Sequence, residues 1–245
     1  MKKDLQSYRI HNETYEKETD FYSKDAIMKR TEKTKDFERT GFELALMLTK
    51  NIPETHIDIG CGVGWLIRKL QPYFKYSIGI EPSEAALSSA KELMKGYSSV
   101  SFLNCDMVDG ITSLNLQKPV FFTTGAVLSH IENFYVIDFL NLLDKAPKGS
   151  VLFFSENYDR NIDWTMWHIR NKEWWRKHLP GWQLIFFDIE NGGYASGIYG
   201  LKIEKEKILP AYTRDLLWLS YWNIDRFKNI TERVLKKILR IITNS

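Results

Sequence analysis

The sequence predicts a doubly wound α/β fold, and three observations support this prediction. Short apolar stretches suited to strands alternate with stretches of helical periodicity between residues 51 and 205, which is typical of βαβ units whose parallel sheet is covered on both faces. The first expected strand runs into a glycine-rich turn at "DIGCGVGW". The last two expected strands are joined through Asn191, Gly192 and Gly193, which indicates an antiparallel hairpin. We therefore expect a mostly parallel, seven-stranded sheet with this hairpin at its C-terminal end.

The expected elements follow one another in a regular order. Strands are predicted at residues 55–60, 76–81, 100–106, 119–125, 150–157, 182–190 and 194–204. Helices are predicted at residues 65–74, 82–97, 135–146 and 164–181, with a polar connection over residues 107–118. The second helix has Pro82 and Glu84 in its first turn, as the start of a helix favours.

Three parts are expected along the chain. No internal repeat, low-complexity tract or flexible linker divides it, so we expect one core domain over residues 51–205 with helical additions at both ends. Residues 1–50 are predicted to form a helical cap or lid, and residues 206–245 a helical extension. Within that extension, Arg226 to Arg240 holds six basic residues and one acidic residue among apolar ones. Such a helix can lie on an anionic membrane surface, dock on a partner, or pack on its own domain.

The bulk composition excludes several classes of protein. The net charge is only +3, from 34 basic and 31 acidic side chains, so no nucleic-acid partner is expected. Two cysteines are too few for a disulfide framework, and their spacing does not suggest zinc. No stretch has the roughly 18 apolar residues of a membrane span or the pattern of a signal peptide. We expect a cytoplasmic protein whose C-terminal helix is its candidate contact with membrane.

The spacing of the glycines narrows the ligand of the turn. A dinucleotide motif needs G-x-G-x-x-G, but Trp65 stands three residues after Gly62, and Ile67 three after Gly64. A nucleotide P-loop needs a Lys followed by Ser or Thr, and neither pair follows these glycines. Asp58 precedes the turn, where a carboxylate would repel pyrophosphate but attract a cation. The ligand should therefore carry positive charge, as the ammonium and sulfonium of S-adenosylmethionine do.

Two further acids end the next two strands. Glu81 lies 17 residues after Gly64, where a carboxylate can accept both hydroxyl groups of a ribose. Asp106 and Met107 follow the third strand and could offer a carboxylate to an adenine amino group and an apolar side chain to the ring. Open α/β sheets bind ligands along the edge where these strands end.

With these motifs the sequence resembles the class I S-adenosylmethionine-dependent methyltransferases. The resemblance lies in "HIDIGCGVG", "IGIEPSEAAL", "FLNCDM" and "FFTTGAVLSHIEN", over roughly residues 54–157, and implies that residues 51–205 are a Rossmann-like core that binds S-adenosylmethionine. It implies a cofactor site built by Asp58, Gly60, Cys61, Gly62, Gly64, Glu81, Asp106, Met107, Thr124 and Gly125.

Two histidines are the candidate general bases, because an alcohol acceptor needs one and an amine does not. His130, in "GAVLSHI", follows the fourth strand. Many members of the family carry a histidine here with a structural role, and some use it with glutamates to bind magnesium. Ala126 and Ser129 occupy the glutamate positions in this chain, so no metal is expected. His168, in the tryptophan-rich segment after the fifth strand, is the other candidate.

The acceptor is expected to bind near His168. Trp164, Trp167 and His168 would share one face of the predicted helix 164–181, where they could stack on a sugar or an aromatic acceptor, and Arg170 could bind an anionic group. The alternative is that these tryptophans pack the helix against the sheet. Tyr22 is a candidate substrate residue, since N-terminal segments of related enzymes often fold over the cofactor.

The predicted function is methyl transfer from S-adenosylmethionine to a small polar metabolite, with O-methylation of a sugar, nucleotide-sugar or glycan precursor as the leading expectation. The alternatives are N-methylation of a small molecule, or a non-catalytic module that binds the cofactor or a partner on the same fold.

Overall fold

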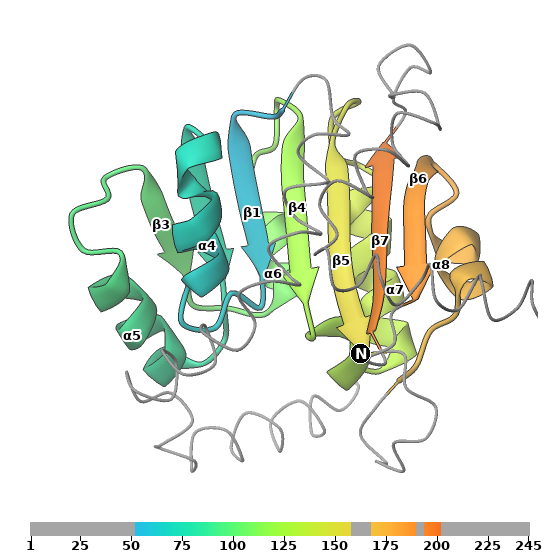
Figure 1. Ribbon diagram of the computed structural model, residues 1–245, viewed down its shortest axis with the longest axis horizontal. Coiled ribbons are helices and arrows are strands. Elements are labelled where there is room, and N and C mark those ends of the chain that lie inside the picture. The colour runs from blue at the N-terminus through green and yellow to red at the C-terminus, as the bar shows by residue number, and fades with distance from the viewer. Residues whose placement is uncertain (1–51, 158–167, 190–193, 202–245) are drawn as a thin grey trace, which may run out of the picture.

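The computed structural model describes residues 52–157, 168–189 and 194–201 (Figure 1). The predicted N-terminal cap, residues 1–50, and the predicted C-terminal extension, residues 206–245, lie outside the described residues. So does the link between the last two strands, residues 190–193.

A seven-stranded sheet forms the centre of the molecule, in the order β3-β2-β1-β4-β5-β7-β6. Its strands are β1 (Thr55–Ile59), β2 (Tyr76–Ile80), β3 (Val100–Leu103), β4 (Val120–Gly125), β5 (Val151–Asn157), β6 (Trp182–Ile189) and β7 (Tyr194–Leu201). The first five strands pair in parallel. β7 pairs antiparallel with both β5 and β6. The α/β fold with a mostly parallel sheet is thus confirmed.

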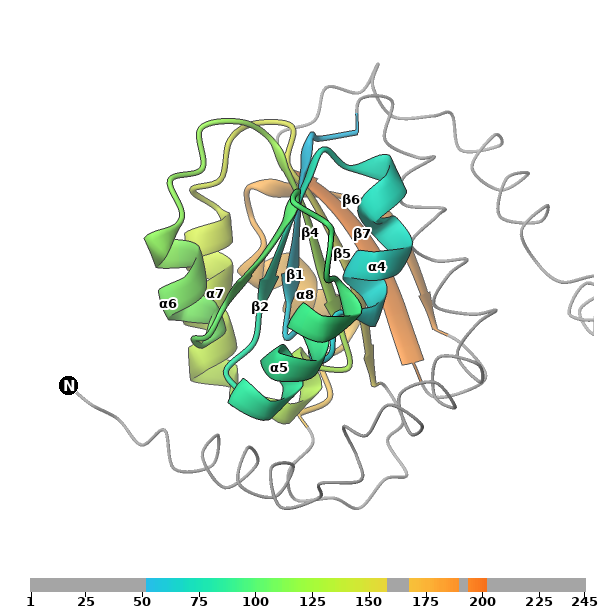
Figure 2. The same cartoon turned by 90° about the vertical axis from the view of Figure 1, so that its left-hand side faces the viewer.

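Helices cover both faces of the sheet. They are α4 (Trp65–Leu70), α5 (Glu84–Leu93), α6 (Met107–Ser113), α7 (Asn133–Leu143) and α8 (Lys172–His178), with short 3-10 turns η1 (Gln71–Tyr73) and η2 (Leu128–His130). Figure 2 shows α4 on one side of the sheet, and α6 and α7 side by side on the other. Because every crossover carries a helix, the inner parallel strands β1, β4 and β5 are buried and read as apolar runs.

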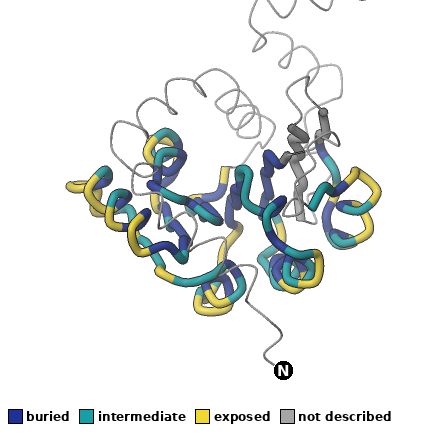
Figure 3. Tube along the Cα trace, turned by 90° about the horizontal axis from the view of Figure 1, so that it is seen from below, coloured by how far each residue is buried: buried dark blue, intermediate teal, exposed yellow. Residues whose placement is uncertain are grey.

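The largest core cluster lies between the sheet and the α6–α7 face. Its members include Ile57, Phe122, Phe139 and Phe154, all essentially inaccessible to solvent. Trp175 of α8 stacks on Phe154, with ring centroids 4.1 Å apart. Figure 3, seen from below, shows this buried centre surrounded by helices whose outer sides are exposed.

Side-chain caps explain where three of the helices begin. Ser83 Oγ accepts from the N–H of Ala86 at the start of α5, Asp106 Oδ1 accepts from Val108 and Asp109 at α6, and Asn171 Oδ1 accepts from Trp174 at α8. A capping oxygen satisfies a backbone donor that the first turn of a helix leaves without an intrahelical partner.

Two predictions about helices were wrong. Residues 107–118 were expected to be a polar connection, but α6 occupies Met107–Ser113 because the Asp106 cap starts a helix in a segment of weak helix formers. The helix expected over residues 164–181 is shorter. Residues 168–171 are not helical, and α8 runs from Lys172 to His178 because Asn171 caps it there.

The carboxyl ends of the parallel strands gather at one edge of the sheet, toward which β4 and β5 point in Figure 1. Parallel strands of an open α/β sheet place their ligands at this edge. None of the described helices has the length and apolar character needed to cross a membrane.

Candidate cofactor and acceptor site

The glycine turn after β1 adopts a backbone that only glycine tolerates well. Gly60, Gly62 and Gly64 have φ of 66°, 51° and 75°, all in the left-handed region. The N–H groups of Gly60 and Cys61 donate to the carbonyl of Ile80 at 2.8 and 3.1 Å. The turn is therefore held against the end of β2 before α4 begins.

Glu81 joins this turn to the next one. Its Oε2 accepts from the N–H of Gly62 and its Oε1 from the N–H of Ser83, both at 3.0 Å. Burial raises the pKa of Glu81, and the two backbone donors oppose that rise. The carboxylate keeps further lone pairs on each oxygen, which can accept from ligand hydroxyl groups.

Asp58 is buried on β1 beside the same turn. Thr123 of β4 is its register partner and donates its hydroxyl to Asp58 Oδ1 at 2.6 Å. His56 Nε2 lies 2.8 Å from Thr123 Oγ1. His56 is fully buried, and this contact links it through Thr123 to Asp58.

The other predicted cofactor residues have clear structural roles as well. Cys61 packs in the core between α4 and β2, and burial raises the pKa of its thiol, with Asp58 and Glu81 adding to the rise. Asp106 caps α6, and Met107 is buried in the main core cluster. The strand expected over residues 100–106 ends at Leu103, and Asp106 and Met107 instead begin α6, with their side chains engaged by the protein.

Open space lies beside one glycine of the turn, Gly62, and beside Gly125, the last residue of β4. A Cβ added at Gly62 or at Gly125 would meet no atom within 4 Å in the described structure. A Cβ at Gly60, by contrast, would lie 2.5 Å from a methyl group of Val127. The open space at Gly62 lies beside Glu81, whose Oε2 accepts from the Gly62 N–H.

The segment after β4 is held in a strained conformation. Ala126 has φ of 54° and is the one non-glycine residue with positive φ in the described ranges. Its N–H donates to the carbonyl of Ser155 at 2.7 Å. Backbone strain of this kind persists where the surroundings fix it, and it clusters at functional sites.

Glu156, at the end of β5, fixes this segment from one side. Its Oε1 accepts from the Thr124 hydroxyl at 2.9 Å and from the Val127 N–H at 3.4 Å, and its Oε2 accepts from the Ser129 N–H at 3.0 Å. Burial raises the pKa of Glu156, and these hydrogen bonds with the charge of Arg170 work against the rise. Glu156 was not among the predicted site residues, although it is a further acid at the end of an apolar strand.

Arg170 holds the same segment from the other side. Its two terminal nitrogens donate to the carbonyls of Leu128 and Ile131, and its Nε donates to Asn133 Oδ1 at 2.9 Å. The side chain is buried. Three of its N–H donors are thus engaged by the protein, so Arg170 organises the loop; its binding of an anionic acceptor stays a prediction.

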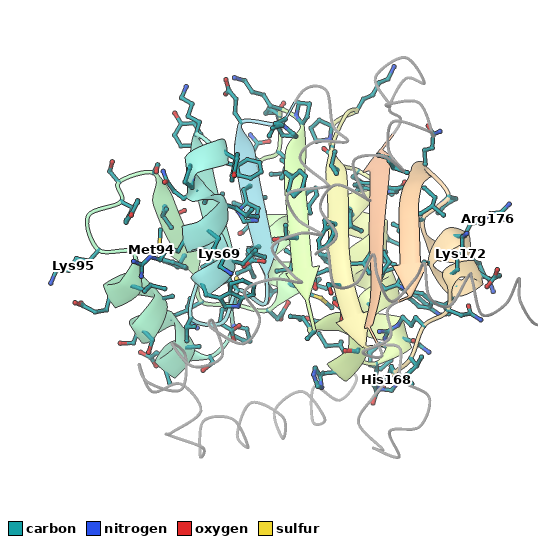
Figure 4. All side chains as sticks on the ribbon, viewed as in Figure 1. Lys69, Met94, Lys95, His168, Lys172 and Arg176 are labelled. Atoms are coloured by element: carbon teal, nitrogen blue, oxygen red, sulfur yellow. The ribbon has the colours of Figure 1, made fainter. Side chains whose placement is uncertain are left out.

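The two candidate bases meet at this segment. His130 ends η2, and the backbone N–H of His168 donates to the carbonyl of Ser129 at 2.7 Å. His168 lies near the arrowhead end of β5 in Figure 4. Burial and, secondarily, the charge of Arg170 lower the pKa of His168, which favours the neutral, proton-accepting imidazole.

Three predicted substrate residues cannot be placed. Tyr22, Trp164 and Trp167 lie outside the described residues. The helical face that would join His168 to these tryptophans is not formed at His168, which precedes α8. Among the described residues, no group of three His, Cys, Asp or Glu side chains could hold a metal ion.

Comparison with known proteins matches part of this chain to methyltransferases. Residues 57–136, which run from β1 into α7, match the sequence model of a methyltransferase domain. A protein of Mycoplasma pneumoniae, provisionally named a tRNA methyltransferase, is 32% identical over 79 residues. That match covers 31% of this chain, and the chain spans only 37% of the length of that relative.

Solved structures share the fold at low identity. The N-methyltransferase NodS of Bradyrhizobium japonicum, in complex with S-adenosylhomocysteine, has a TM-score of 0.57 and 18% identity, over 68% of this chain and 87% of that one. An S-adenosylmethionine-dependent methyltransferase of Clostridium acetobutylicum has a TM-score of 0.57 and 15% identity, over 77% and 99%. The resemblance expected from the sequence is thereby confirmed.

Proposed function

We propose that this chain is a class I S-adenosylmethionine-dependent methyltransferase that transfers a methyl group from S-adenosylmethionine to a small polar metabolite. The match of residues 57–136 to a methyltransferase domain and the shared fold support this. The observation that carries the proposal is the bridge from Gly62 to Glu81, which joins the left-handed glycine turn to the acid of the next strand. The bound cofactor supplies an electrophilic methyl group on a sulfonium that leaves readily.

The residues of this chain would bind the cofactor and orient its methyl group. Asp58 and the glycine turn would hold the amino-acid part of the cofactor, and Glu81 its ribose. Asp106 and Met107 would lie toward the adenine, and Thr124 and Gly125 near the methyl group. Holding the nucleophile in line with that methyl group can contribute on the order of 7–11 kcal/mol.

We propose an alcohol as the acceptor, with a sugar, nucleotide-sugar or glycan precursor as the leading class. The support is the pair of histidines at the segment after β4, because a hydroxyl nucleophile needs a base and His168 tends to be neutral. Tyr22, Trp164 and Trp167 are the candidate contacts for that acceptor. An amine acceptor is the alternative, and it would need neither histidine.

The helical additions at the two ends are proposed to complete the enzyme. Residues 1–50 would act as a cap over the cofactor and residues 206–245 as an extension, with a peripheral membrane or protein contact through the basic segment Arg226–Arg240. A tRNA acceptor, which the name of the Mycoplasma pneumoniae relative raises, has no support from the net charge of +3.

The test is a turnover screen of the full chain with methyl-labelled S-adenosylmethionine. The panel holds sugars, nucleotide sugars, sugar phosphates, amines and bulk tRNA. Label transfer to a hydroxyl compound, lost in Glu81→Ala, supports the proposal. Transfer to amines alone would mean that the acceptor is an amine and not an alcohol. Transfer to tRNA would contradict a small-molecule acceptor. An unchanged rate in Glu81→Ala would contradict the proposed cofactor site.

A further inference from the structure

We propose that His56 and Thr123 are positioning residues that aim the Asp58 carboxylate at the amino-acid part of the cofactor. The inference rests on the proposed function, and it adds two residues, neither of them a predicted cofactor ligand, that act through a third. The three side chains form one buried chain of hydrogen bonds across β1 and β4.

The pairing of the strands brings the three groups together. Asp58 and Thr123 are opposite each other in the parallel register of β1 and β4. His56 precedes Asp58 by two residues, so both side chains leave β1 on the same face. The donor-to-acceptor distances are 2.6 Å from Thr123 to Asp58 and 2.8 Å between His56 Nε2 and Thr123 Oγ1.

The hydrogen bonds all donate in one direction, from His56 through Thr123 to Asp58. A threonine hydroxyl has a single proton, and Thr123 commits it to a carboxylate, which is the stronger acceptor. Its oxygen can then only accept from His56, so the imidazole carries its proton on Nε2. Each link donates toward Asp58, and the carboxylate at the end of the chain is fixed in orientation.

The surroundings of His56 argue against a packing role alone. The ring stacks on Phe74 at 5.0 Å and lies edge-on to Phe121 at 6.3 Å, with no exposure to solvent. Its Nδ1 is buried and has no hydrogen-bond partner within the described residues. A phenylalanine would fill this apolar site without the unsatisfied nitrogen, so the Nε2 donor is the feature that distinguishes histidine here.

The consequence is a selective effect on one part of the ligand. Asp58 precedes the turn Gly60–Gly62, on the side proposed for the cofactor's ammonium group, whereas Glu81 serves the ribose. Loss of these hydrogen bonds should therefore weaken the binding of ligands that carry the amino-acid group and leave the binding of ligands without it unchanged.

Two probes separate these effects: S-adenosylhomocysteine, which has the amino-acid group, and 5′-methylthioadenosine, which has the adenosine and the thioether but lacks that group. We expect Thr123→Val to weaken S-adenosylhomocysteine binding by about tenfold or more and to change methylthioadenosine binding by less than about twofold. Thr123→Ser, which keeps the hydroxyl, should restore the affinity. In an Asp58→Ala background, Thr123→Val should cause no further loss.

Ser150→Ala is the matched control. Ser150 is also a buried hydroxyl in two hydrogen bonds, donating to Pro147 and accepting from Val120, but it directly precedes β5, at the end of the sheet opposite the turn. It should leave the affinity for both probes unchanged. If Thr123→Val does not fold, His56→Leu and His56→Gln replace it, and only the leucine variant should show the selective loss, since glutamine retains an N–H donor.

Three outcomes would overturn the inference. If Thr123→Val weakened the binding of both probes equally, the hydrogen bonds among His56, Thr123 and Asp58 would have a structural role only. Unchanged binding of both probes would remove its role altogether. A wild-type chain that binds neither probe would contradict the proposed function itself and the inference with it, whereas the first two outcomes leave the proposed function standing.

Discussion

The backbone N–H of Gly62 donates to Glu81 Oε2 at 3.0 Å, across 19 residues of sequence. The other oxygen of the same carboxylate accepts from Ser83, whose hydroxyl caps α5. One buried acid thus sets the distance between the turn after β1 and the turn after β2. These are the two turns that the proposed cofactor would bridge.

Removal of this acid should weaken cofactor binding strongly. A well-made hydrogen bond to a charged group contributes about 1.5–3 kcal/mol, so Glu81→Ala should reduce the affinity for S-adenosylhomocysteine by roughly 10- to 100-fold. Isothermal titration calorimetry measures the dissociation constant of S-adenosylhomocysteine. Glu84→Ala, an exposed acid in the first turn of α5, is the control. Equal affinities of Glu81→Ala and wild type would place the ribose elsewhere.

The glycines of the turn should differ in their response to alanine. Gly62→Ala should cost about 1–2 kcal/mol of unfolding free energy, from left-handed strain alone, because its Cβ meets open space. Gly60→Ala should cost about 1–3 kcal/mol more, since its Cβ would lie 2.5 Å from Val127. Urea unfolding measures both.

Shortening Val127 supplies the control for Gly60. The double variant Gly60→Ala, Val127→Ala should recover part of the added cost, because the clash is removed while the strain remains. Identical unfolding free energies for Gly60→Ala and Gly62→Ala would contradict this account of the turn.

Burial of His56 should make the fold sensitive to acid. Burial lowers the pKa of His56 from 6.5 to about 3. The neutral imidazole is the folded form, so its stabilising contribution is complete above pH 6.5 and is lost as the pH falls toward 3. Near pH 5 the loss should be about 2 kcal/mol of unfolding free energy relative to neutral pH.

The variant His56→Gln isolates that contribution. Its unfolding free energy should fall less than that of the wild type between about pH 7.5 and about pH 5, by the same 2 kcal/mol or so. Urea unfolding at the two pH values is the measurement. Parallel pH dependence of the two proteins would mean that His56 is not a buried neutral residue.

The hydrogen bonds that Arg170 donates to the segment after β4 should depend on the shape of its guanidinium group. Arg170→Lys cannot donate to Leu128, Ile131 and Asn133 together, so we expect a loss of about 1–3 kcal/mol for buried groups left unpaired. Arg176→Lys on α8, where the side chain points away from the sheet (Figure 4), should change stability by less than about 0.5 kcal/mol. Equal losses of unfolding free energy in the two variants would show that the hydrogen bonds of Arg170 do not stabilise the fold.

The pH dependence of turnover should identify the base. With an alcohol acceptor, kcat/KM should rise with pH through the pKa of the essential histidine in its neutral form. If His168 is that residue, the midpoint lies below 6.5, since burial and Arg170 lower its pKa. His168→Ala should then abolish the rise, and His130→Ala should keep it. A profile unaltered in both variants would exclude both histidines as bases.

The sequence predicted the arrangement of the turn after β1 and Glu81 better than that of the segment after β4. Asp58, Gly62 and Glu81 stand at strand ends that periodicity and glycine spacing identify locally, so their arrangement follows from the parallel sheet. Glu156 and Arg170 act across 27 to 42 residues, on a segment whose conformation no local pattern reveals. Their roles therefore depended on the structure.

Local competition explains the errors in the helices. The segment Met107–Ser113 contains Gly, Thr and Ser, which lowers its helical pattern, yet the Asp106 cap and burial of Ile111 suffice to form α6. Asn171 interrupts the apolar pattern before α8 by capping that helix. His56 looked unremarkable because its partner, Thr123, lies 67 residues away.

Thermal unfolding with two competing ligands tests the central claim most directly. S-adenosylhomocysteine at about 100 times its dissociation constant should stabilise the chain by roughly 2.7 kcal/mol, which for a chain of this length raises Tm by about 5–10 °C. A nicotinamide dinucleotide at the same concentration should leave Tm unchanged. A shift with the dinucleotide and none with S-adenosylhomocysteine would contradict the account.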